Sequence, residues 1–419
     1  MTDIKVRTLN CGVRVIMEKI DYVKSAAFGV WVKAGAVYES AENSGVSHFI
    51  EHMMFKGTEK RSARKIAEDV DKIGGQMNAF TGKEATCYYV KTTWENLETG
   101  AEVILDMINN AVFDSREMTK ERKVICEEIK MIGDQPDDLA NDTVTELVFK
   151  GTPLAKSITG TPTSLKGISR RVMSEYKEKE YTRDSLVVSV AGNFDEEKFC
   201  AFLEDKFSRL KASKPSVTVR TAAYKPSFKV IVKDIQQSHI CLAAKGVSLD
   251  DDRYYALSLL SNIMGGSMSS RLFQNIREEK GLAYSVFSMN SSYSSDGCFV
   301  IYAGVGHDKI RDALGGIEEE LELLRRDGIT KDELSMAKEQ MKSSYVFGQE
   351  NVTSRMFANG KNLILVDRIF TPDEVVKNID KVSLDDIDNV KKLLCDPAAY
   401  SGAAVTNRRV AWKDIWKWH

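Results

Sequence analysis

The amino-acid sequence predicts an α+β protein that contains two copies of one folding unit. Two observations support this prediction. Short strand-like segments alternate with long amphipathic helical patterns, and the two halves of the chain align with each other at a constant offset. The length of 419 residues also exceeds that of one ordinary hydrophobic core, which favours more than one domain.

Strand and helix patterns follow one another in the first half of the chain. Residues 26–33 and 87–92 have the apolar, β-branched and aromatic composition of strands. Residues 97–111 and 116–131 instead repeat apolar side chains at helical spacing. This alternation of the two patterns indicates an α+β layout.

One stretch of the sequence is the best candidate for a linker. Residues 211–216 and 224–227 concentrate Pro, Ser and Lys and lose the hydrophobic periodicity of the segments around them. We therefore expect one domain over residues 1–212 and a second over residues 213–419.

An offset of 211 residues aligns the two halves of the chain. It places Cys-Tyr-Tyr-Val at residues 87–90 on Cys-Phe-Val-Ile at residues 298–301, and Glu128 on Glu339. The period is far longer than that of solenoid repeats. The interpretation is therefore a duplicated domain, and the alternative is chance similarity.

Composition and charge exclude several classes of protein. Lys and Arg number 59 against 61 Asp and Glu, and both signs are mixed along the chain, so nothing indicates a surface for nucleic acid or membrane. The seven cysteines are scattered without a Cys-x-x-Cys pair, which favours a reducing compartment. The N-terminal sequence has no signal or transit pattern. We therefore expect a cytoplasmic protein.

The strongest chemical signal is a pair of histidines four residues apart, His48 and His52, with Glu51 beside them. On a helix this spacing puts both imidazoles on one face, where both can reach a single tetrahedral zinc ion. A nearby carboxylate is the group that takes the proton of a zinc-activated water. The chain has only five histidines, although such a pair can also be purely structural.

A third ligand should come from another helix, and residues 120–129 offer Glu121, Glu127 and Glu128. At about 100° per residue, Glu121 and Glu128 border one predicted apolar stripe together, whereas Glu127 points almost oppositely. A carboxylate beside a core needs a partner, which could be a metal ion or a cation such as Arg122. The stripe itself comprises Met118, Ile125, Ile129 and Ile132.

Residues 48–58, His-Phe-Ile-Glu-His-Met-Met-Phe-Lys-Gly-Thr, resemble the inverted zinc motif H-x-x-E-H of the pitrilysin and insulinase family. The resemblance is closest to its short-chain branch, which includes the mitochondrial processing peptidases and bacterial homologues. It implies one Zn²⁺ per chain, held by His48, His52 and a glutamate 76 residues further on, which is Glu128. It also implies that Glu51 is the catalytic base and that Glu121 supports the metal site.

The resemblance also implies residues that bind the substrate. Asn78, Ala79, Phe80 and Thr81 match a family edge strand that pairs with an extended peptide. Arg277 and Tyr284 match an Arg/Tyr pair that holds the substrate backbone and stabilises the oxyanion. Without the family, the same residues would be an ordinary strand, a structural arginine and a packed tyrosine. The preceding Gly265-Gly266 lacks the lysine and glycine spacing of a phosphate loop.

The resemblance implies two similar α/β-roll domains, each a mixed sheet with helices packed on one face, which together form one half of a clamshell. Zinc would bind in the N-terminal domain alone, because the offset carries His48 and His52 onto Leu259 and Ile263. Such short chains close the shell by pairing, so we expect a homodimer. Arg277 and Tyr284 of one subunit would then complete the site of the other.

The sequence as a whole predicts a zinc-dependent metalloendopeptidase that cleaves unstructured peptides or presequence-like segments in a closed chamber. The alternatives are a non-catalytic scaffold relative of the same fold and a zinc hydrolase that acts on other substrates. The aromatic segment 412–418 is expected to pack against the second domain.

Overall fold

The computed structural model describes residues 4–208, 210–212 and 223–416, which form two compact units. Unit 1 draws its described residues from Met1–Ile129, Lys156–Thr218 and Tyr345–Thr371. Unit 2 draws them from Lys130–Ala155, Val219–Ser344 and Pro372–His419. The units therefore differ from a division into 1–212 and 213–419, because each one includes a segment from the other half of the sequence. Residues 213–216 of the linker candidate lie outside the described residues.

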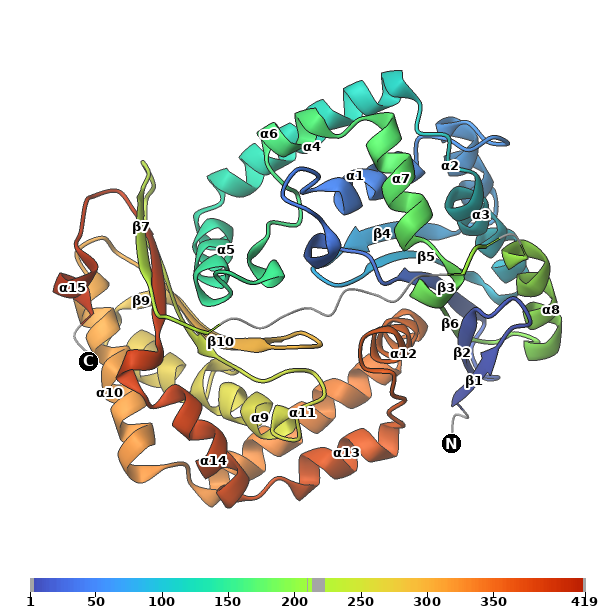
Figure 1. The fold of residues 1–419 in the computed structure, drawn as a ribbon. Helices are drawn as coiled ribbons and strands as arrows, with labels where there is room; N and C mark the ends of the chain where they lie inside the picture. The colour runs from blue at the N-terminus through green and yellow to red at the C-terminus, as the bar shows by residue number, and fades with distance from the viewer. Residues whose placement is uncertain (1–3, 209, 213–222, 417–419) are drawn as a thin grey trace. The chain divides into compact units, whose positions relative to one another are not determined.

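Unit 1 is built on a mixed six-stranded sheet with the order β1-β2-β6-β3-β5-β4 (Figure 1). The β2–β6 pair is parallel and the other neighbouring pairs are antiparallel. Its strands are β1 Ile4–Thr8, β2 Arg14–Lys19, β3 Ser25–Val32, β4 Gln76–Thr81, β5 Thr86–Thr93 and β6 Leu186–Gly192. Its helices are α1 Val46–Met54, α2 Ala63–Lys72, α3 Leu97–Asn110, α4 Ser115–Asp134, α6 Pro162–Gly167, α7 Arg170–Glu180, α8 Glu196–Phe207 and α12 Val352–Val366.

Alternate residues of the strands face opposite sides of this sheet, as the pleat requires. On one side Phe28 and Val30 of β3 are buried in the main core with helices that include α1, α3 and α8. On the other side Ala27 and Trp31 pack against α12. The expected mixed sheet with helices is present, and α12 covers the face opposite to the other helices.

Unit 2 is built on a mixed five-stranded sheet with the order β7-β11-β8-β10-β9. Only the β7–β11 pair is parallel among its described neighbours. Its strands are β7 Phe228–Val232, β8 Ser238–Lys245, β9 Ala283–Ser292, β10 Gly297–Val305 and β11 Ser401–Thr406. Its helices are α5 Pro136–Val148, α9 Tyr254–Gly265, α10 Ile310–Asp327, α11 Lys331–Gln349, α13 Pro372–Lys381, α14 Leu384–Leu394 and α15 Trp412–Ile415.

The internal repeat predicted from the sequence is confirmed by the order of the elements. The offset of 211 carries β5 onto β10, and α1, α3 and α4 correspond in order to α9, α10 and α11. The two sheets also correspond strand by strand, since β2, β6, β3, β5 and β4 match β7, β11, β8, β10 and β9. The chain thus contains two similar domains.

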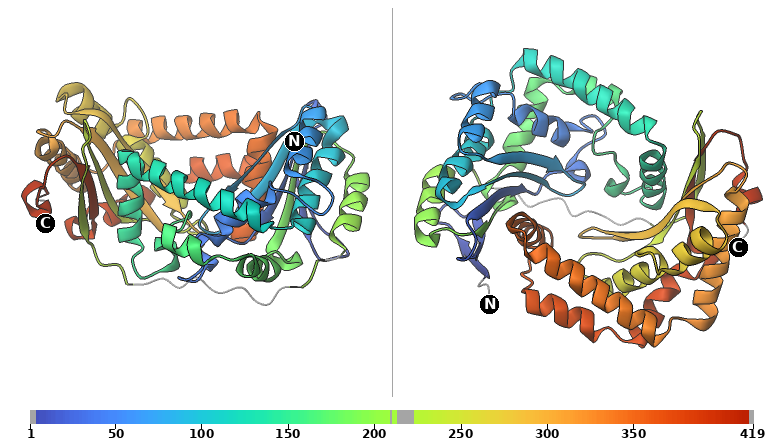
Figure 2. Two further views of the ribbon diagram at one scale, coloured as in Figure 1. Left: turned by 90° about the horizontal axis from the view of Figure 1, so that it is seen from above. Right: turned by 180° about the vertical axis from the view of Figure 1, so that it is seen from behind.

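The two copies exchange one helix each. Helix α5 of the first copy packs against β8 and β11 in unit 2, whereas its counterpart α12 packs against β3 and β6 in unit 1 (Figures 1 and 2). Gly360 lets α12 approach the sheet closely, because a Cβ atom there would lie 2.1 Å from Nε1 of Trp31. Helices α4 and α11 each pass from one unit into the other.

The C-terminal aromatic segment packs onto unit 2, as predicted. Ile415 and Trp416 are buried, and the ring of Trp412 stacks on Phe228 with 5.0 Å between centroids. Trp418 lies outside the described residues. Among the helices of the described residues, none is both long enough and apolar enough to span a membrane.

Candidate metal centre

Helix α1 carries the predicted motif, and its N-terminus is fixed by a buried carboxylate. Gly45 precedes the helix with a φ of 90°, and a Cβ atom there would lie 2.6 Å from the carbonyl oxygen of Thr159. The Glu39 carboxylate accepts hydrogen bonds from the backbone amides of Gly45 (2.7 Å) and Ser47 (2.9 Å). Glu39 thus satisfies helix-terminal amides with a charge of the favourable sign.

His48 and His52 project from the same face of α1, as their spacing predicts. Their ring centroids lie 4.7 Å apart. His48 is buried, with 7% of its surface exposed, whereas His52 is half-buried. Burial lowers the pKa of His48 to about 4, and the neighbouring His52 acts in the same direction. His48 is therefore a neutral imidazole at pH 7, which is the form that binds metals.

Helix α4 supplies the carboxylate that meets both histidines. Oε2 of Glu128 lies 3.7 Å from Nε2 of His48 and 3.6 Å from Nε2 of His52. One ligand atom from each of these residues lies within 4.8 Å of the other two. Two imidazoles and one carboxylate fit a divalent ion such as zinc, and three protein ligands leave a fourth tetrahedral position for a reactant.

Glu121 lies beside this group, behind His52. Its Oε2 is 3.2 Å from Nδ1 of His52, and its Oε1 is 2.7 Å from Nζ of Lys56. Arg122, considered from the sequence as an ion-pair partner, instead donates to the carbonyl oxygens of Leu165 and Ile168. The expectation of a cation beside Glu121 is therefore met by Lys56, whereas the Arg122 side chain fastens α4 to the segment around α6.

The neighbouring Glu127 is exposed, as the helical geometry of α4 predicts.

Glu51 lies on α1 between the two histidines and faces the edge of the sheet. Thr81, the last residue of β4, donates a hydrogen bond of 2.5 Å from its hydroxyl to Oε2 of Glu51. Burial raises the pKa of the Glu51 carboxyl above its usual range, and the hydrogen bond from Thr81 acts in the opposite direction. A carboxylate with a raised pKa next to a metal site suits general base chemistry.

The four residues predicted to bind substrate all lie on β4, the edge strand of the sheet in unit 1. Asn78 and Phe80 are exposed, whereas Ala79 packs against the main core. Phe80 points to the face covered by α12, where its ring centroid is 5.5 Å from that of Phe357. The link between Thr81 and Glu51 had no signal in the sequence, since the two residues are 30 positions apart.

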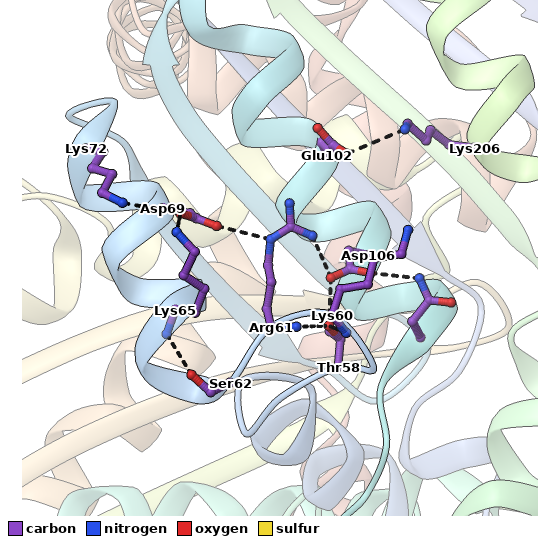
Figure 3. Close-up of polar contacts among 11 residues, drawn as sticks. Thr58, Lys60, Arg61, Ser62, Lys65, Asp69, Lys72, Glu102, Asp106 and Lys206 are labelled. Atoms are coloured by element: carbon purple, nitrogen blue, oxygen red, sulfur yellow. Dashed lines mark hydrogen bonds and ion pairs between the residues drawn. The ribbon is translucent and has the colours of Figure 1, made fainter.

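The loop after α1 is tied to the next two helices by a polar network (Figure 3). The Thr58 hydroxyl donates to Asp106 of α3 (2.7 Å), and Arg61 donates to Asp106 (2.6 Å) and to Asp69 of α2 (3.2 Å). Arg61 also accepts a backbone hydrogen bond of 2.8 Å from Thr58. These contacts fix the loop that starts at the C-terminal end of the metal-binding helix.

Arg277 and Tyr284 belong to unit 2, where they lie together. The Arg277 guanidinium is 4.7 Å from the ring centroid of Phe273 and 5.8 Å from that of Tyr284. Tyr284 is the second residue of the edge strand β9 and is 75% exposed. The pair is therefore positioned to meet a molecule that approaches this edge.

The second copy lacks a metal site at the corresponding place. Leu259 and Ile263 of α9, which the repeat aligns with His48 and His52, are buried apolar residues. The group of His48, His52 and Glu128 was the one such metal-ligand set found among the described residues.

Two family models match this chain. Residues 14–162 match the model described as insulinase (peptidase family M16), and residues 167–341 match the peptidase M16 inactive domain. The chain belongs to peptidase family M16. The recognition of the insulinase family from the sequence is therefore confirmed.

Relatives of this M16 chain extend over most of its length. The Bacillus subtilis (strain 168) protein called uncharacterized zinc protease YmxG is 41% identical over 93% of this chain and 95% of the relative. An uncharacterized zinc protease of Rickettsia felis is 38% identical over 91% and 92%. The structure of a protease from Helicobacter pylori, 21% identical, superposes with a TM-score of 0.89 over 97% of this chain and all of the other, which supports the fold.

Proposed function

We propose that this M16 chain is a zinc-dependent metalloendopeptidase that cleaves unstructured peptides. One observation carries the proposal: Nε2 of His48, Nε2 of His52 and Oε2 of Glu128 converge, with Glu51 held beside them at the edge strand β4. The names of the relatives from Bacillus subtilis and Rickettsia felis, both zinc proteases, support the same activity.

In this proposal the three ligands would hold one Zn²⁺, which would supply Lewis acidity and lower the pKa of a water molecule. Glu51 accepts the proton of the attacking water and later returns it to the departing amine. Thr81 keeps the carboxylate of Glu51 in one orientation through its hydroxyl. Glu121 would orient His52 through Nδ1, the ring nitrogen that does not face Glu128.

The substrate would be an extended peptide that adds a strand to the free edge of β4, along Asn78 to Thr81. Backbone hydrogen bonds to an edge strand grip almost any unfolded chain, so selectivity would come from side-chain contacts. A residue paired opposite Thr81 would lie next to Glu51, because the Thr81 hydroxyl is bonded to that carboxylate. Edge pairing therefore supports the cleavage of peptides rather than of other substrates.

We further propose that two chains form a homodimer and that peptides are cleaved in the chamber between them. Arg277 and Tyr284 of one subunit would hold the substrate backbone at the metal site of the partner. Their contact with each other and the 75% exposure of Tyr284 are compatible with that role. Light scattering tests the assembly, and a fully active monomer would contradict it.

The test of the activity is cleavage of a mixed library of unstructured peptides before and after chelation, with zinc added back and metal content measured. Cleavage that is lost on chelation and restored by zinc supports the proposal. The matched variant is Glu51→Gln, which should retain zinc and lose cleavage. A zinc-loaded Glu51→Gln protein with normal turnover would refute the role of Glu51. A wild-type protein that stays inactive with zinc would instead indicate a scaffold relative.

A further inference from the structure

Lys56 is the residue next to the metal site that the proposed function leaves without a role. It lies four positions after His52, just beyond the end of α1, and its Nζ is 2.7 Å from Oε1 of Glu121. The other oxygen of the same carboxylate, Oε2, is 3.2 Å from Nδ1 of His52. Lys56, Glu121 and His52 therefore form a continuous polar chain that ends on a metal ligand.

Glu121 is buried, and its carboxylate therefore needs the ion pair with Lys56 to keep its position. Glu121 is 6% exposed, so its carboxylate has lost most of its contact with water. A buried carboxylate without a cation is strongly unfavourable, and its side chain would turn toward solvent or toward another donor. Lys56 binds Oε1 of Glu121, and Oε2 remains directed at Nδ1 of His52.

The orientation of His52 depends on this second oxygen. A hydrogen bond from Nδ1–H to a carboxylate places the ring lone pair on Nε2, which is the atom that faces Glu128 at 3.6 Å. His48 has no such support, because its buried Nδ1 has no hydrogen-bond partner among the described residues. Of the two imidazoles, His52 is thus the one that the Lys56–Glu121 pair supports.

The backbone of Lys56 is itself held in place. Its amide donates to the carbonyl of Met53 (3.1 Å), and the residues that follow are fixed by the network of Thr58, Arg61 and Asp106 (Figure 3). The loop therefore presents the Lys56 side chain to Glu121 from a rigid base, at a small entropic cost for forming the pair.

The second copy of the repeat lacks this polar chain together with the metal ligands. The offset of 211 carries His52 onto Ile263 and Lys56 onto Ser267, while Glu121 is replaced by Asp332. The cation is thus present in the copy that has the ligands and absent from the copy that does not.

We propose that Lys56 is a positioning residue of the metal site, which fixes Glu121 against His52 and thereby raises the affinity for zinc. The inference rests on the metal site of the proposed function. It concerns zinc binding, which is measured separately from peptide cleavage, so failure to cleave peptides would bear on the proposed function alone.

The test is a chelator competition that measures the zinc dissociation constant of the full chain. Replacing Lys56 with methionine keeps an unbranched side chain one atom shorter and removes the charge. We expect Lys56→Met to raise the dissociation constant roughly 10- to 100-fold, as loss of the support behind a metal ligand does. Lys56→Arg, which retains a cation, should stay within about threefold of wild type. Lys60→Met, in the same loop with an exposed side chain, is the matched control.

Two further measurements separate positioning from a general structural effect. The melting temperature of metal-free Lys56→Met should fall, because buried Glu121 loses its cation, and adding Glu121→Gln should regain most of that loss while the zinc affinity stays low. In a double-mutant cycle, Lys56→Met combined with Glu121→Gln should lose no more affinity than Glu121→Gln alone, because Lys56 acts through Glu121. Unchanged zinc affinity in Lys56→Met, additive losses in the cycle, or no rescue by Lys56→Arg would each overturn the proposal. A wild-type chain that binds no zinc would overturn it together with the proposed function.

Discussion

Replacement of Arg355 by methionine tests how α12 is held on the sheet of unit 1. Arg355 forms an ion pair with Glu18 of β2, and Asn359 donates to the other oxygen of that carboxylate at 2.8 Å. Glu18 is 1% exposed and Arg355 8%, so water screens neither charge. In the variant Glu18 would stay buried and lose its contact with Arg355, while Asn359 would still donate to it.

Removal of one partner from a buried ion pair costs about 3–5 kcal/mol. Asn359 still donates to Glu18, so we expect the lower end, about 3 kcal/mol. For a unit of this size that corresponds to a fall in melting temperature of roughly 6–12 °C. Differential scanning calorimetry measures it, with Arg64→Met as the control, because Arg64 pairs with Glu68 at the surface.

A second variant makes the reasoning refutable. If the cost comes from the unpaired charge of Glu18, the double variant Glu18→Leu with Arg355→Met should regain at least half of the lost stability. A melting temperature for Arg355→Met within about 2 °C of wild type, as for a surface pair, would show that the ion pair does not hold α12.

Two more outcomes follow from contacts of α1. Thr81→Val should lower kcat roughly tenfold with zinc content unchanged, because Glu51 loses the hydrogen bond that orients it, while Thr81→Ser should keep the rate. His48 has a folded-state pKa of about 4, below its ordinary value, so the stability it contributes is present above about pH 6.5 and is lost as the pH falls toward 4. The free energy of unfolding of the metal-free protein, measured with urea, should therefore fall by up to roughly 3 kcal/mol over this range of pH. The fall should be smaller in His48→Asn. Equal rates for Thr81→Val and wild type, or equal pH dependence in His48→Asn, would contradict these expectations.

The sequence was informative where the signal is local or periodic. The spacing of His48 and His52 and the helical phase of Glu121 and Glu128 predicted which side chains share a face, and these side chains meet in the structure. The offset of 211 predicted two similar domains, because duplicated segments keep their order of strands and helices.

The contacts that the sequence did not predict join residues far apart in the chain. Nothing in the pattern of α12 distinguishes packing on its own sheet from packing on the sheet of the other copy, since α12 and α5 each cover buried apolar strand residues. Glu39 at the start of α1 and Lys56 behind Glu121 are charged residues in polar segments, where most such residues are solvated. Their roles depend on burial, which composition alone does not reveal.

The exchange of helices also means that the sheet of unit 1 is synthesised well before the helix that covers one of its faces. All strands of the sheet in unit 1 have been made by Gly192, but α12 ends at Val366, about 170 residues later. At usual translation speeds the face of the sheet on which α12 packs therefore stays uncovered for roughly 10–35 s. Ile16, Trp31 and Val187 lie on that face, so this apolar surface stays without its helix long after the metal ligands have been made.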